Sequence, residues 1–110
     1  MSTFDPARSQ VSEDSLQRFL YEPLQVDVQS VPGIGPKAAE HLRAHGGVCT
    51  AHQLLGKFLL LCDDAMTQAD HLDAFFNFLR ECGIQSHRSG IVHAISQKAD
   101  TLFPSSGYGI

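Results

Sequence analysis

A short stretch in the first half of the chain has the residue types to bind an anion. Gly33 and Gly35 flank Ile34, and Pro36 follows at once. Glycine has no Cβ, so the turn can be tight and its amides can lie against a ligand. Pro36 suits the first position of a helix, and a helix beginning here points free N–H groups and its positive dipole end outward. The stretch therefore predicts a phosphate site that reads no base.

The residues that follow extend this prediction. Lys37 adds a positive charge in the first helical turn, Ala38 lets two helices approach closely, and His41 lies one turn further on. The pattern over about 27–44 resembles the helix-hairpin-helix DNA-binding motif, with a short first helix near 27–31 and a second helix over 36–44. A helix-packing turn that binds nothing is the alternative interpretation.

A second glycine turn joins the last two predicted helices. Gly83 ends the first of them, and we expect Ser86 to cap the second. The Ser86 hydroxyl, the side chains of His87 and Arg88, and the amides at this helix start are the donors for a second phosphate. An ordinary helical turn is again the alternative.

The elements that position these turns all have helical patterns. Apolar residues recur at helical spacing from Leu16 onward, and Thr50 with Gln53 and Thr67 with Asp70 have capping-box spacing. No strand pattern is present. We predict an all-α, compact single domain of five to six helices. It spans residues 12–104, between a flexible arm over 1–11 and a flexible tail over 105–110, and its last helix buries Ile91, Val92, Ile95, Ala99, Leu102 and Phe103.

The predicted helix after Thr50 is apolar nearly all round, which is too much for one face of a small monomer. A homodimer contact on this helix is one interpretation, and a deeply buried core helix is the other.

Composition limits the classes of function. The net charge of −4 argues against a protein that coats DNA by bulk charge, although the hairpin region and the last helix are mildly basic. No segment suits a membrane span or a signal peptide, and three cysteines without a Cys-x-x-Cys fit a reducing, intracellular location. No catalytic motif, metal set or cofactor motif stands out, even though His41 and His45 share a helix face. We therefore expect no enzyme, no metal and no cofactor.

Four stretches together resemble the barrier-to-autointegration factor family. They are Phe-Leu-Tyr-Glu-Pro at 19–23, the hairpin at 30–42, Leu-Gly-Lys-Phe-Leu-Leu-Leu at 55–61, and Phe-Leu-Arg-Glu-Cys-Gly at 78–83 with the helix that follows. Their order and spacing cover roughly residues 12–103. The resemblance implies a homodimer of the SAM/RuvA-domain type that binds and bridges double-stranded DNA without sequence preference, with a role in chromatin organisation in the nucleus and cytoplasm.

The resemblance also implies roles for particular residues. The hairpin donors are Gly33, Ile34 and Gly35, and the donors of the last helix are Ser86, His87 and Arg88. The family also binds LEM-domain proteins of the nuclear envelope beside the helix that here would present a dimer and partner surface of Leu55, Gly56, Phe58, Leu59 and Leu61.

Several family lysines are missing. Their positions correspond to Ser15, Glu40, His41 and His87, whereas Lys37 is an additional cation. Fewer phosphate contacts lower both affinity and its salt dependence. The main alternative is therefore a paralogue with weak or lost DNA binding that acts as a protein-interaction dimer. A DNA-binding subunit of a larger enzyme complex is a third hypothesis.

Overall fold

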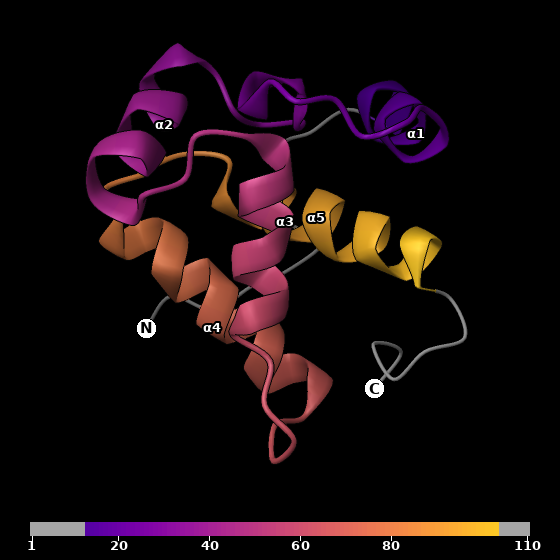
Figure 1. Cartoon of the computed structure of the whole chain (residues 1–110), viewed down its shortest axis with the longest axis vertical. Helices are drawn as coiled ribbons and strands as arrows, with labels where there is room; N and C mark the ends of the chain where they lie inside the picture. The colour runs from indigo at the N-terminus through magenta and orange to yellow at the C-terminus, as the bar shows by residue number, and fades with distance from the viewer. Residues whose placement is uncertain (1–12, 104–110) are drawn as a thin grey trace.

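The computed structural model describes residues 13–103, so the predicted arm over 1–11, Ser12, Pro104 and the tail over 105–110 lie outside the described residues. Over this range the chain is all-helical, as predicted, with Asp27 and Thr50 forming an isolated β-bridge. The elements are α1 (Glu13–Tyr21), the 3-10 turn η2 (Val28–Ser30), α2 (Pro36–His41), the π-helical turn η3 (Leu42–Gly46), α3 (Ala51–Leu60), α4 (Gln68–Glu81) and α5 (Arg88–Leu102) (Figure 1).

Helix α5 is the centre of the packing, because α1, α3 and α4 all contact it. Figure 1 shows α3 crossing in front of α5, with α2 and the hairpin above one end and α1 beside the other. The core is continuous through the described residues, and apolar burial of this kind is the main source of stability. Its fully buried side chains include Leu42, Leu54, Phe58, Phe75, Ile91 and Ile95.

Both predicted capping boxes are present. Gln53 N–H donates to the Thr50 hydroxyl at 3.1 Å and begins α3, and Asp70 N–H donates to the Thr67 hydroxyl at 3.1 Å and begins α4. In each box the side chain at the third helical position also accepts from the cap's own N–H. Helix α4 consequently starts at Gln68.

The predicted buried stripe of α5 is correct for Ile91, Val92, Ile95 and Ala99, but wrong for its last members. Leu102 and Phe103 are 46% and 41% exposed. In Figure 1 the final turn of α5 points away from α3 and α4, so these two helices do not cover it.

Lys98 is buried in α5 and ties that helix to the end of α1. It is only 3% exposed, and its Nζ donates to the carbonyl oxygens of Phe19 at 3.0 Å, Leu20 at 3.3 Å and Glu22 at 2.6 Å. These carbonyls are the acceptors that a helix C-terminus leaves without intrahelical partners. Burial lowers the pKa of Lys98, and the nearby Glu22 charge partly opposes that shift.

Candidate nucleic-acid interface

The hairpin begins with a single 3-10 turn, η2, rather than the short α-helix predicted near 27–31. The Asp27 carboxylate accepts from Gln29 N–H at 2.9 Å and caps this turn. Ile34 N–H donates to the Val31 carbonyl at 3.1 Å, and both side chains are buried. Ile34 is therefore the apolar residue that anchors the turn to the core.

Gly33 is required by the conformation and by the packing. Its φ of +95° is in the left-handed region, and an added Cβ would lie 3.0 Å from Ile91 Cγ1 and 3.3 Å from His87 Cβ. The turn of the hairpin therefore rests directly on the first turn of α5. This one contact brings the two predicted donor segments, distant in sequence, onto the same surface.

Gly35 differs from Gly33, because the conformation of the turn does not require glycine at this position. Its φ is −99°, and no atom outside its immediate neighbours lies within 4 Å of an added Cβ. Nothing in the fold demands glycine here. Its missing side chain instead leaves the surface open for a ligand to approach the backbone.

Helix α2 begins as predicted, with Gly35 as N-cap and Pro36 in the first turn. Ala39 N–H makes the first helical bond, to the Gly35 carbonyl at 3.0 Å, so the amides of Lys37 and Ala38 precede the intrahelical ladder. The helix continues through the π-helical turn η3 and ends at Gly47, whose φ is +68°. The helical segment therefore extends slightly beyond the predicted range of 36–44.

A surface groove of about 420 Å³ collects most of the predicted DNA-binding residues. It is lined by the hairpin, by the start of α2 and by the segment that enters α5. The lining residues are Gly33, Ile34, Gly35, Pro36, Lys37, Ala38, Ser86 and His87.

A second hollow of about 290 Å³ adjoins this groove, since Lys37, Ala38 and Ser86 line both. His41 lies in the second hollow, against Gly83, where an added Cβ would be 3.0 Å from the His41 ring. The φ of +100° at Gly83 also needs glycine. The imidazole thus connects the hairpin helix to the turn before α5.

The start of α5 differs from the prediction in its cap. Ser86 does not cap the helix; His87 is the N-cap, in the left-handed conformation with φ of +62°, and its carbonyl accepts from Ile91 N–H at 2.9 Å. Because α5 begins at Arg88, Ser86 lies one residue before the cap position. A left-handed conformation costs energy in any residue but glycine, and such strain concentrates at functional sites.

Arg88 is a predicted donor that lines neither the groove nor the adjoining hollow. Its guanidinium carbon lies 5.0 Å from the centre of the Phe76 ring, and the side chain is half-buried. This cation–π contact holds it away from the residues that line the groove.

The predicted basic character of the hairpin and the last helix is weaker than the sequence indicated. Lys98 is buried, and Arg43 forms an ion pair with Glu40 on α2 and η3, which raises the pKa of Arg43. The position of Lys98 could have been found in the sequence, because Ile91, Ala94 and Ile95 precede it at helical spacing and are all buried.

Helix α3 divides the predicted partner residues between the core and the surface. Leu55 and Phe58 lie in the core of their own chain, and Leu59 and Leu61 are half-buried. Gly56 is exposed with open space around an added Cβ, and Leu60, absent from the predicted set, is 75% exposed. Gly56 and Leu60 are one turn apart, so they share an outward face.

Two further observations concern the described residues. His41 and His45 stack with ring centroids 5.9 Å apart, but within residues 13–103 no three metal-ligating side chains gather into a site. No helix in that range has the length and apolarity to cross a membrane.

The chain was compared with known proteins. A family model described as barrier to autointegration factor matches residues 10–94, well over half of the chain. No curated protein and no solved structure matches it.

Proposed function

Because this chain belongs to the barrier-to-autointegration factor family, we propose that it binds the phosphate backbone of double-stranded DNA without sequence preference and bridges two duplexes as a homodimer. Family membership confirms the resemblance found in the sequence, together with the SAM-like all-helical fold. A role in chromatin organisation in the nucleus, with LEM-domain partners, belongs to the same proposal.

The observation that carries the proposal is the shared groove between the hairpin and the start of α5. Two segments more than fifty residues apart contact each other through Gly33 and line one groove, and each leads into a helix whose first amides precede the intrahelical ladder. Amides at a helix start bind phosphate oxygens and carry no information about the base. Lys37 supplies a mobile positive charge beside them, because its side chain is exposed.

Bridging requires two copies that face apart, and the exposed side of α3 is the surface that we assign to that contact. A glycine inside a helix costs about 1 kcal/mol relative to alanine, and the fold of one chain gives no reason for Gly56. Close approach by a second helix is such a reason, and Leu60 beside it offers apolar area.

The proposal is tested by fluorescence anisotropy with two unrelated duplexes over a salt series, together with a mass measurement in the same buffer. We expect equal affinity for both sequences, a loss of affinity as salt rises, and the mass of a dimer. Light scattering then shows whether the isolated chain joins duplexes by itself, which a subunit that needs a larger enzyme complex would not do.

The alternative of a protein-interaction dimer is favoured by one observation. The chain carries a net charge of −4, and Glu40 neutralises Arg43 on the hairpin side. A folded dimer that binds neither duplex at low salt would select this alternative over the DNA-binding proposal.

We expect Leu60→Glu to convert the dimer to a monomer, because a carboxylate on the outward face of α3 would be desolvated and would meet its own copy. The mass from light scattering should fall by half while the helical content is retained. Gln97→Glu adds the same charge to an exposed position of α5 and should leave the dimer intact. A Leu60→Glu protein that remains dimeric would place the contact elsewhere.

A further inference from the structure

The groove between the hairpin and α5 and the hollow that adjoins it contain few groups whose charge is fixed near neutral pH. Lysine keeps its positive charge through this range, whereas histidine in general loses its charge as pH rises from about 5 to 8. Lys37 lines both the groove and the hollow, His87 lines the groove, and His41 lines the hollow. Among the described residues no carboxylate lines either one. The charge of this surface therefore depends mainly on two histidines.

The other basic side chains of the described residues do not supply the missing charge. Arg88 lies 5.0 Å from the centre of the Phe76 ring, and Lys98 is buried in α5. Arg43 pairs with Glu40, and the two line a separate hollow of about 260 Å³. The lysines and arginines of the described residues that line neither the groove nor the adjoining hollow are Arg18, Arg43, Lys57, Arg80, Arg88 and Lys98.

His41 is held in place at the end of α2. An added Cβ at Gly83 would lie 3.0 Å from His41 Nδ1, so the turn before α5 packs against the imidazole. On its own helical segment the ring stacks with His45, with centroids 5.9 Å apart, and Lys37 lies one turn earlier. An anion in the hollow would therefore meet the imidazole and the Lys37 ammonium together.

His87 is fixed where the hairpin meets α5. It is the N-cap with φ of +62°, its carbonyl accepts from Ile91 N–H at 2.9 Å, and an added Cβ at Gly33 would lie 3.3 Å from its own Cβ. Glycine adopts this conformation without strain, so the backbone gives no reason for a histidine here. The exposed imidazole in the groove is what histidine adds at this position.

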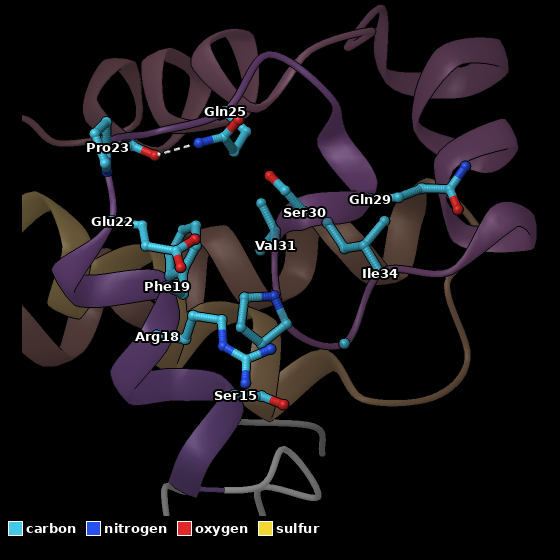
Figure 2. A pocket seen from close by; sticks show the side chains of 12 residues that line it. Ser15, Arg18, Phe19, Glu22, Pro23, Gln25, Gln29, Ser30, Val31 and Ile34 are labelled. Atoms are coloured by element: carbon cyan, nitrogen blue, oxygen red, sulfur yellow. Dashed lines mark hydrogen bonds between the residues drawn. The ribbon is translucent and has the colours of Figure 1, made fainter.

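The elements that surround the two histidines present acidic and basic side chains together. Figure 2 shows Arg18 and Glu22 on either side of Phe19, in a cleft of about 270 Å³ on the other side of the hairpin. The formal charges of each such pair sum to zero, so they do not fix the charge of the groove. The pairs are Glu40 with Arg43 on α2 and η3, Arg80 with Glu81 at the end of α4, and Arg18 with Glu22 at α1.

We propose that protonation of His41 and His87 controls the affinity of this surface for DNA, so that binding is weak above neutral pH and strengthens as pH falls. This inference rests on the proposed function. A neutral imidazole has one N–H and no charge, whereas the imidazolium has two N–H donors and a positive charge. Between these two states the charge on the lining residues rises from that of Lys37 alone to three positive charges. By linkage, DNA binding then takes up protons.

The test is fluorescence anisotropy on one duplex at about pH 5.5 and about pH 8, over about 0.05 to 0.2 M salt at each pH. For the unchanged protein we expect about tenfold tighter binding at the lower pH, and a salt slope larger by about 0.9 for each histidine that gains a phosphate contact. His41→Gln and His87→Gln should each lose about half of the added slope. His52→Gln, which removes an exposed histidine of α3 outside the groove and the hollow, should keep it.

A lysine variant tests the same inference without an acidic buffer. His87→Lys replaces a titratable charge by a fixed one, so at about pH 8 it should bind about threefold more tightly than the unchanged protein and gain less on acidification. His52→Lys adds the same charge on α3 and should bind like the unchanged protein. Circular dichroism and the mass of each variant, measured at both pH values, check the fold and the dimer.

The possible results separate this inference from the proposed function. If the unchanged protein binds DNA with one affinity and one slope at both pH values, the histidines do not control binding and only this inference fails. A pH effect that His52→Gln reduces as much as His87→Gln does would assign it to overall charge and overturn the inference, as would an unchanged affinity of His87→Lys at about pH 8. If the unchanged protein binds no duplex at either pH, both proposals fail.

Discussion

Gly35→Glu is expected to abolish DNA binding and to leave the fold intact. An added side chain at Gly35 meets nothing within 4 Å, and φ of −99° suits any residue. The new carboxylate would stand in the groove beside the amides proposed to hold phosphate. Juxtaposed like charges cost several kcal/mol, so we expect binding at low salt to weaken by about a hundredfold or more. Anisotropy measures the loss, and thermal unfolding should be unchanged.

A size-matched control isolates the charge. Gly35→Gln has the same shape and no charge, so the difference between the two variants reports electrostatic repulsion alone. Gly33 is the poorer position for this experiment, because its positive φ and the 3.0 Å approach of Ile91 would destabilise any substitution. If Gly35→Glu binds DNA as well as Gly35→Gln does, the groove is not the binding surface.

Lys98→Met is expected to destabilise the protein by about 2 kcal/mol. Methionine fills a similar volume but leaves the carbonyls of Phe19, Leu20 and Glu22 without their shared donor, and unsatisfied buried acceptors cost about 1–3 kcal/mol. Denaturant unfolding measures the change. Lys37→Met removes an exposed lysine from α2 and should alter stability little. A loss for Lys98→Met no larger than that of Lys37→Met would show that water replaces the ammonium at no cost.

A second measurement is the pH dependence of the free energy of unfolding, compared between the unchanged protein and Lys98→Met. Burial lowers the pKa of Lys98 below its ordinary value, so the native state releases this proton at a lower pH than the unfolded chain. The unfolded state then binds more protons over the interval between the two values, and stability from this group rises with pH through that interval. The stability gap between the unchanged protein and Lys98→Met should therefore widen as pH rises toward 10.5.

The sequence by itself determined the features that depend on neighbours along the chain. A capping box needs a side chain and an amide three residues apart, so Thr50 with Gln53 and Thr67 with Asp70 could be recognised without tertiary information. The same holds for the left-handed glycines that end helices, Gly47 and Gly83. The all-helical class, the hairpin and the family followed from such local patterns and their order.

Only the tertiary structure decided which of the predicted side chains line the groove and which are held elsewhere. The spacing of Lys98 from Ile91 and Ile95 places it on the buried face of α5, but only the packing of α1 supplies the three carbonyls that accept from its ammonium. His87, and not Ser86, is the N-cap of α5. Gly33 and Gly35 are alike in sequence, but only Gly33 packs against another helix. Pairing between elements and the meeting of distant segments depend on contacts that no spacing along the chain encodes.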